Sequence, residues 1–196
     1  NRKIHTGLIP RLGGVGIFIS VVITCGLVTM IAFLNSGRTL NNLIAPPYIF
    51  FFAAIFIIHI LGLIDDFKSQ KPVVKLIFQI LAASCVVAGG FSFKEITIPY
   101  IGTLSLGILG FPFSILWIIA ITNAMNLVDG MDGLAGGIAS FASLSMGIIS
   151  LIQGQIVTAI IAFTLFGASA GFLLFNLPPA KIFMGDSGSL VIGFIL

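Results

Sequence analysis

Four polar side chains recur at intervals of three residues in the stretch NAMNLVDGMDGLAGG (123–137), directly after a long apolar run. They are Asn123, Asn126, Asp129 and Asp132. Asn offers amide donors and acceptors, and Asp offers hard oxygen ligands. This set suits Mg²⁺ bridged to phosphate groups, because Mg²⁺ prefers oxygen and shares its coordination shell with substrate. Since steps of three residues drift by only about 60° around a helix, the sequence predicts one shallow polar spiral.

The glycines within this stretch leave the interpretation open. Gly130 and Gly133 would let a flat ligand approach the backbone. The alternative is a helix C-terminus with glycine stops, or polar contacts between neighbouring helices.

A second polar stretch, GLIDDFKSQKPVVKLIFQ (62–79), holds the adjacent carboxylates Asp65 and Asp66. Neighbouring carboxylates repel, and such a pair suits metal ligation or proton abstraction. Lys75 and Gln79 lie one helical turn apart and could reach a phosphate group. The alternative is an ordinary charged loop whose lysines extend their stems along apolar surface.

The third polar stretch, FNLPPAKIFMGDSGS (175–189), combines Asn176, a proline pair and Asp186. Asp186 is a candidate metal ligand, and the Gly/Ser turn before a helix offers backbone N–H groups to phosphate. Phe183 could stack on a nucleotide base. The alternatives are a polar helix cap for the acid and serines and a lipid-facing ring, since the chain holds 19 Phe.

Two further polar features have competing explanations. The basic opening stretch NRKIHTGLIPRLGG (1–14) could bind the phosphate of a lipid or nucleotide, or it could anchor the chain beside a membrane. His59 lies deep in an apolar run, where we expect a hydrogen-bonded helix-packing residue rather than a ligand.

The elements that must position these residues are transmembrane helices. The chain is 58% hydrophobic and 8% charged, with a mean hydropathy of +1.22, whereas soluble domains are about 25% charged. A spanning helix needs about 20 apolar residues, and the sequence predicts an all-α polytopic membrane helix bundle. Six full spans are expected at 15–35, 47–64, 75–93, 106–128, 134–153 and 156–175, with the start of a seventh near Gly188. The segment 95–106 predicts a short external hairpin.

Charge distribution predicts the orientation of these spans. With the N-terminus inside, seven basic residues fall on the inner side and two on the outer side, which the positive-inside rule favours. Five of the six acids fall at the inner ends of spans: Asp65, Asp66, Asp129, Asp132 and Asp186. Their shared side predicts one cytoplasmic-face site for Mg²⁺-dependent phosphoryl chemistry on a substrate dissolved in the bilayer.

These motifs together resemble one known family, the polyprenyl-phosphate N-acetylhexosamine-1-phosphate transferases. RKIHTGLIPRLGG, GLIDDF, KLIFQ, NAMNLVDGMDGLAGG and PPAKIFMGDSGS occur in the family's order and spacing across nearly the whole chain. The resemblance implies transfer of a sugar 1-phosphate from a UDP-sugar to undecaprenyl phosphate, with release of UMP, in a bacterial inner membrane. It implies Mg²⁺, or Mn²⁺ in its place, no nucleic-acid partner, and allows a homodimer.

The resemblance also implies roles for individual residues. Asp186 is similar to the family's Mg²⁺ ligand, helped by Asn126. Asp65 is similar to the carboxylate that deprotonates the lipid phosphate, with Asp66 beside it, and Lys75 to a phosphate-binding lysine. The remaining expected substrate contacts are Asp132 at uracil, Phe183 stacked on it, and Asn123, Asp129 and Asn176 in the same pocket.

The first motif and the loop ITIPYIGTLSLG look more like the N-acetylglucosamine branch than the phospho-N-acetylmuramoyl-pentapeptide branch, which is the alternative. The family's first span and its later His-rich loop are missing, so we expect a single transmembrane domain (1–196) truncated at both ends. Two rival classes are weaker. A CDP-alcohol phosphatidyltransferase needs an Ala-Arg pair after Asp129-Gly130, and a transporter would place its acids near mid-membrane.

Overall fold

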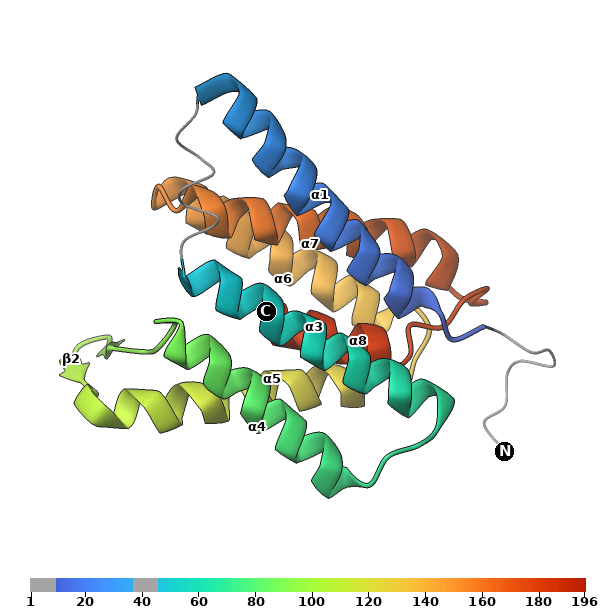
Figure 1. The fold of residues 1–196 in the computed structure, drawn as a ribbon, viewed down its shortest axis with the longest axis horizontal. Helices are drawn as coiled ribbons and strands as arrows, with labels where there is room; N and C mark the ends of the chain where they lie inside the picture. The colour runs from blue at the N-terminus through green and yellow to red at the C-terminus, as the bar shows by residue number, and fades with distance from the viewer. Residues whose placement is uncertain (1–9, 37–45) are drawn as a thin grey trace.

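The computed structural model describes residues 10–36 and 46–196, and helices make up most of this part of the chain (Figure 1). The elements in chain order are α1 (Gly13–Ser36), α3 (Pro46–Phe67), α4 (Pro72–Ala88), β1 (Glu95–Ile98), β2 (Gly102–Ser105), the 3₁₀ turn η1 (Gly107–Leu109), α5 (Gly110–Val128), α6 (Leu134–Ile152), α7 (Ile156–Asn176) and α8 (Asp186–Ile195). The helical prediction is confirmed. The predicted hairpin is also present, as two antiparallel strands that pair Glu95 with Ser105 and Ile98 with Gly102.

Four of the described helical stretches are long and apolar enough to cross a membrane: Pro47–Phe67, Gly107–Val128, Leu134–Ile152 and Ile156–Asn176. Three shorter apolar helical stretches accompany them: Gly13–Val28, Pro72–Ala88 and Asp186–Ile195. The span predicted at 75–93 is α4, which ends earlier, at Ala88, because Gly89 and Gly90 follow and Gly90 has a φ of 107°. The structure therefore supports an integral membrane protein with four candidate spans.

Helix α8 lies inside the bundle, packed against α1, α3 and α5 (Figure 1). Every residue from Ser187 to Phe194 is buried. The close approach of α3 requires glycine at one point, because a Cβ on Gly62 would lie 2.5 Å from the Cα of Ser187. Small residues let two helices in a membrane approach this closely. Packing in the core therefore fixes Asp186, the first residue of α8.

The polar stretches singled out in the sequence converge at one end of the bundle (Figure 1). The start of α1, the α3–α4 loop, the α5–α6 turn (129–133) and the α7–α8 loop (177–185) all lie there, while the β1–β2 hairpin lies at the opposite end. The expectation that these segments share a side is met by the part of the chain that the structure describes.

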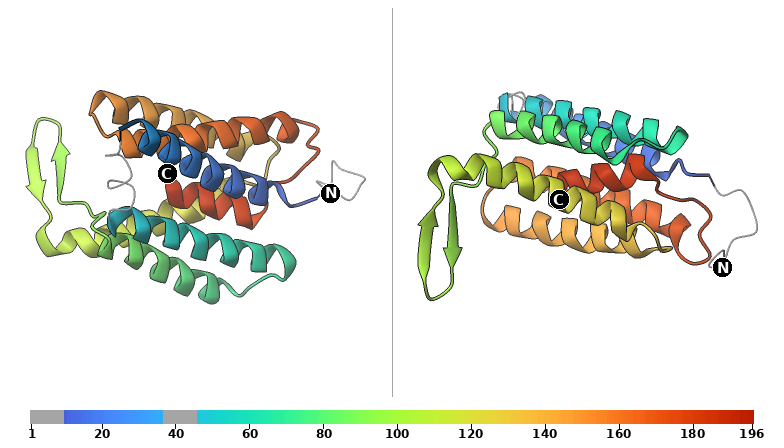
Figure 2. Two further views of the ribbon diagram at one scale, coloured as in Figure 1. Left: turned by 45° about the horizontal axis from the view of Figure 1, so that its top comes forward. Right: turned by 90° about the horizontal axis from the view of Figure 1, so that it is seen from below.

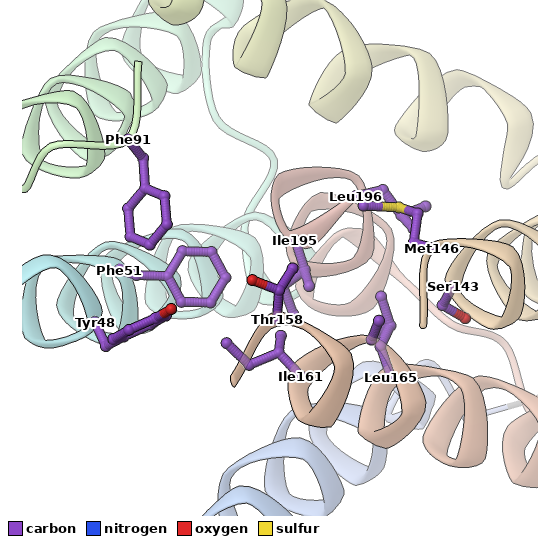
Figure 3. Close-up of a pocket in the computed structure, with 11 residues that line it drawn as sticks. Tyr48, Phe51, Phe91, Ser143, Met146, Thr158, Ile161, Leu165, Ile195 and Leu196 are labelled. Atoms are coloured by element: carbon purple, nitrogen blue, oxygen red, sulfur yellow. The ribbon is translucent and has the colours of Figure 1, made fainter. Parts of the chain in front are cut away.

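An apolar cavity of about 160 Å³ lies between α3, α6, α7 and α8 (Figure 3). Tyr48, Phe51, Phe91 and Leu165 are among its lining residues. Its lining, as far as the described residues show, contains no acidic or basic side chain. The candidate chemistry lies at the polar end.

Candidate active site

A cavity of about 320 Å³ opens at the polar end of the bundle. It is lined by Arg11, Asp66, Asp129, Gly130, Met131, Asp132, Asn176, Phe183, Gly185 and Asp186. Six of these lining residues were predicted as site residues, and they come from α3, α7, α8 and the two loops that precede α6 and α8. Residues far apart in sequence thus line one cavity, and their side chains give it several carboxylates and one aromatic ring.

Lys75 links two of the predicted carboxylates. Its Nζ lies 3.1 Å from Asp65 Oδ2 and also forms a salt bridge with Asp186 Oδ2. All three side chains are only partly accessible to solvent. The other oxygen of Asp65 accepts a hydrogen bond from the backbone N–H of Gln70 at 2.6 Å. The ammonium therefore joins the predicted base on α3 to the predicted metal ligand on α8.

Asp66 caps the N-terminus of α8. Its Oδ1 accepts the Asp186 N–H at 2.7 Å and its Oδ2 accepts the Ser187 N–H at 3.0 Å. An acidic group is favoured at a helix N-terminus because it meets unpaired N–H groups and the positive end of the helix dipole. Gly185 permits this contact, since it has a φ of 74° and a Cβ there would lie 2.7 Å from both oxygens. Asp66 thus positions Asp186, and its predicted catalytic role stays a prediction.

This capping corrects one expectation. The Gly/Ser turn was expected to offer its backbone N–H groups to phosphate, but the first turn of α8 has no such group left over. The carboxylate of Asp66 accepts hydrogen bonds from the N–H groups of Asp186 and Ser187. The N–H groups of Gly188 and Ser189 both bond to the Gly185 carbonyl. The first turn of α8 therefore offers no unbonded N–H group to a phosphate.

Two buried or half-buried polar residues tie the two loops of the cavity together. Asn176, which is 3% exposed, accepts the Gly133 N–H and donates to the Ile182 carbonyl, both at 2.9 Å. Asp132 Oδ2 accepts the Ala180 N–H at 3.0 Å. The 129–133 turn and the 177–185 loop are therefore held in register, and both residues reach the cavity as expected.

The polar spiral does not extend through all four residues. Helix α5 ends at Val128, Asp129 is its C-cap, and Asp132 lies in the following turn, where Gly133 has a φ of 77°. The helix therefore ends at Val128, where the alternative expected a C-terminus, and the predicted ligand roles of Asp129 and Asp132 stay predictions. A helix rises about 1.5 Å per residue, which places Asn123 roughly two turns deeper than Asp129.

The two asparagines accordingly make contacts between helices. Asn126 donates to Ser189 Oγ on α8 at 2.9 Å. Asn123 donates to Gln79 Oε1 at 2.8 Å and accepts from Gln79 Nε2 at 3.3 Å. Asn123 does not line the polar cavity, so its predicted substrate contact is not supported. Gln79, expected at phosphate, is 1% exposed and is committed to this amide pair between α4 and α5.

Burial, reinforced by the nearby carboxylates of Asp186 and Asp66, raises the pKa of Asp129 to about 7. A hydrogen bond with the backbone of Gly185 acts in the opposite direction without offsetting the rise. The cavity therefore brings four carboxylates together against the guanidinium of Arg11 and the ammonium of Lys75. A cation brought into it would relieve that repulsion.

We predict that Asp129→Asn raises the melting temperature of the metal-free protein in a pH-dependent way. The pKa of Asp129 is about 7 in the folded state, above the ordinary value of 3.8 for this side chain. The folded state therefore holds the proton more tightly, so the wild type loses stability relative to the variant as pH rises from about 4 to about 7. Melting curves in detergent with a chelator should show the largest difference above pH 7 and the smallest near pH 4. A difference independent of pH would contradict the buried charge.

Sequence reasoning left three cavity features unassigned. Arg11 lines the wall with the acids, although only the basic character of the stretch 1–14 had been noted, and residues 1–9 of that motif lie outside the described residues. Met131 lines the cavity between two predicted positions. Gly185 is essential for the cap, and a glycine directly before an acid at a helix start could have indicated it.

His59 behaves as expected, with Nδ1 3.2 Å from the Ser187 carbonyl.

Comparison with known proteins places this geometry in a family. A family model described as glycosyl transferase family 4 matches residues 48–196. A probable undecaprenyl-phosphate N-acetylglucosaminyl 1-phosphate transferase of Bacillus subtilis (strain 168) is 34% identical over 195 residues, covering 99% of this chain and 51% of the relative.

Two further relatives represent other members. A decaprenyl-phosphate N-acetylglucosaminephosphotransferase of Mycobacterium tuberculosis (strain ATCC 25618 / H37Rv) is 36% identical over 207 residues, covering 100% of this chain and 50% of the relative. A phospho-N-acetylmuramoyl-pentapeptide-transferase of Latilactobacillus sakei (strain 23K) is 41% identical over 155 residues, covering 71% of this chain and 48% of the relative. The chain spans about half the length of these curated relatives. Because the family model covers most of its residues, the chain belongs to glycosyl transferase family 4.

Proposed function

We propose that the protein transfers a sugar 1-phosphate from a UDP-sugar to undecaprenyl phosphate, with release of UMP. The transferred group in this proposal is N-acetylglucosamine 1-phosphate. The observation that carries this proposal is the convergence of Asp65, Lys75 and Asp186 beside the cavity that also holds Asp129 and Phe183. The names of the relatives in Bacillus and Mycobacterium support a polyprenyl phosphate acceptor and an N-acetylglucosamine phosphate donor. Family membership favours this reading over a CDP-alcohol phosphatidyltransferase or a transporter.

The proposed reaction is a direct attack. A phosphate oxygen of the lipid attacks the β-phosphorus of the UDP-sugar, a new pyrophosphate bond forms, and the bond to the UMP phosphate breaks. Asp65 removes the proton from the lipid phosphate. Lys75, between Asp65 and Asp186, holds negative phosphate oxygens and so stabilises the charge that develops during transfer.

We further propose that the site takes Mg²⁺. Among the described residues, no three His, Cys, Asp or Glu side chains form a group that could hold a metal ion. Mg²⁺ is commonly held by only one or two carboxylates together with substrate phosphates, and Asp186 beside Asp129 provides that donor set. When bound, the ion neutralises phosphate charge and orients the pyrophosphate. Asn126 steadies the first turns of α8 through Ser189.

The proposal also includes a membrane location and orientation. We place the polar end on the cytoplasmic face of a bacterial inner membrane, because the basic residues of the sequence concentrate on that side. In this proposal α1 and α4 join the four candidate spans to give six spans, and α8 is the start of a seventh. The product would begin a cell-envelope polymer.

The test is release of UMP by the purified protein in detergent with undecaprenyl phosphate and Mg²⁺. We expect release with UDP-N-acetylglucosamine and none with UDP-N-acetylmuramoyl-pentapeptide. The reverse preference would favour the alternative branch, which the Latilactobacillus relative represents. No UMP from either donor, in a protein that melts cooperatively, would refute the proposed reaction.

We predict that Phe183→Ala weakens binding of the UDP-sugar by roughly tenfold or more, because stacking of a base on an aromatic ring is worth about 1–3 kcal/mol. Phe183 lines the cavity. Its backbone bonds to Pro10 and Gly13 do not depend on the ring. Titration calorimetry with the UDP-sugar measures the effect.

The matched control is Phe175→Ala, which removes a ring that is 52% exposed on α7. This control should leave nucleotide binding unchanged, and neither variant should alter affinity for the lipid phosphate, which carries no base. An unchanged dissociation constant in the Phe183 variant would remove the ring from the proposed uracil site.

A further inference from the structure

The β1–β2 hairpin has one apolar face and one polar face. Because residues directly opposite in an antiparallel pair share a face, Ile96 lies beside Leu104, with Ile98 next along β1. The other face carries Thr97 and Thr103, whose hydroxyls lie 3.2 Å apart, and the pair Glu95 and Ser105. Such alternation is typical of a sheet with one covered face and one wet face.

Two of the three side chains on the apolar face are exposed within the described residues, and the third, Ile96, is half-buried. Ile98 is 39% exposed and Leu104 is 59% exposed. An isolated two-stranded hairpin is at best marginally stable in water, so a contact outside the described chain is needed to explain this face.

The tip of the hairpin points to the same conclusion. Ile98 to Ile101 form a turn closed by a hydrogen bond from the Ile101 N–H to the Ile98 carbonyl. Tyr100 occupies the third position with a φ of 69°, where a turn with Pro at its second position usually takes glycine. Tyr100 is fully exposed, and Ile101 is 80% exposed. A bulky residue in this sparsely populated conformation, with its ring fully exposed, marks the tip as a candidate contact point.

The position of the hairpin identifies that contact. The strands run across the axis of the bundle, at the end opposite the polar cavity (Figure 2). The candidate span Gly107–Val128 begins immediately after β2, and its first residues Ile108 and Leu109 are 82% and 66% exposed. Exposed apolar side chains thus occur both on the hairpin and on the first residues of the candidate span that follows it.

Aromatic residues gather at the base of the hairpin. Phe93, two residues before β1, packs edge-on against Phe113 and Trp117 of α5, with ring centroids 5.4 and 6.0 Å from its own. The Phe93 N–H also donates to Ser114 Oγ at 2.8 Å, which fixes the base of the ribbon to α5. Trp and Tyr are enriched where membrane proteins meet the lipid–water interface, and the hairpin carries Tyr100 at its tip.

We propose that the β1–β2 hairpin is an interfacial anchor that lies on the membrane surface. Its Ile96, Ile98 and Leu104 face enters the boundary between headgroups and acyl chains, and its Thr97 and Thr103 face stays in water. Tyr100 and Ile101 at the tip insert beside it. The partner is a lipid surface, and the proposal does not depend on the catalytic activity.

Single-tryptophan variants test this arrangement in nanodiscs of phosphatidylcholine. The native tryptophan is first removed by Trp117→Phe, which keeps an aromatic ring in the cluster. Ile98→Trp then probes the apolar face, and Thr97→Trp is its matched control on the adjacent, opposite-facing position. We expect the Ile98→Trp variant to lose most of its fluorescence to lipids spin-labelled near the headgroup and to resist aqueous iodide. The Thr97→Trp variant should show the opposite pattern.

A second pair on the other strand, Leu104→Trp and Thr103→Trp, repeats the comparison should the first pair fail to fold. Equal lipid quenching on both faces would overturn the proposal, as would iodide quenching of the apolar-face variants. Protection of those variants from both quenchers would overturn it as well, because it would show that protein, such as a second copy of this chain, covers the face.

Discussion

Asp186→Asn is expected to abolish the proposed transfer by removing the charge that we propose holds Mg²⁺. An amide keeps the shape of the side chain but does not provide the negative oxygen that a hard cation requires. The backbone N–H of residue 186 still bonds to Asp66, so α8 keeps its cap. The loss should therefore come from chemistry at the site, with the fold preserved.

The melting temperature provides a readout besides activity. A ligand at a hundred times its dissociation constant stabilises a folded protein by about 2.7 kcal/mol, so Mg²⁺ should raise the melting temperature of the wild type but not of the Asp186→Asn variant. Glu95→Gln removes the same charge from the exposed hairpin and should keep both the shift and the activity. If Asp186→Asn retains the Mg²⁺ shift, Asp186 serves only as the partner of Lys75.

Asp65→Asn should stop turnover while leaving UDP-sugar binding largely intact. General base catalysis contributes typically 10²–10⁴-fold, so we expect a fall in kcat of that order. We proposed the polar cavity as the UDP-sugar site, and Asp65 is absent from the lining of that cavity. The dissociation constant for the UDP-sugar should therefore change little.

Gln70→Ala is the matched control for this second variant. Asp65 accepts a hydrogen bond from the backbone of Gln70, whereas the Gln70 side chain donates to the Lys68 carbonyl. Removing that side chain keeps the contact at Asp65, so turnover should stay close to that of the wild type. A wild-type rate in the Asp65→Asn variant would show that another group accepts the proton of the lipid phosphate.

The helices could be predicted from the sequence because long apolar runs in a membrane have few alternatives to a helix. The lengths of the helices were harder to predict. Helix α4 stops at Ala88 because Gly89 and Gly90 end it, although the residues before them are mostly apolar. The hairpin was predicted from its β-branched residues with Pro and Gly, and its register follows from the strand pairing.

The site was predictable as a set of residue types but not as a set of contacts. Acids at the inner ends of spans identified Asp65, Asp129 and Asp186 as neighbours. The sequence could not show that Asp66 would occupy the N-terminus of α8, because that contact joins residues 120 apart. Nor could it show that Asn123 would form a hydrogen bond with Gln79, since two amides on different helices can bond to each other only when those helices pack together.

The salt bridges of Lys75 have a consequence for how the chain is made. Lys75 and Asp186 are 111 residues apart, and Asp66 reaches α8 across a similar interval. A ribosome therefore delivers α3 and α4 to the membrane long before the helix that completes their polar contacts. Until α8 arrives, Asp65 and Lys75 have only each other among these three charges. The polar end of the bundle is consequently the last part of this region to complete its contacts during synthesis.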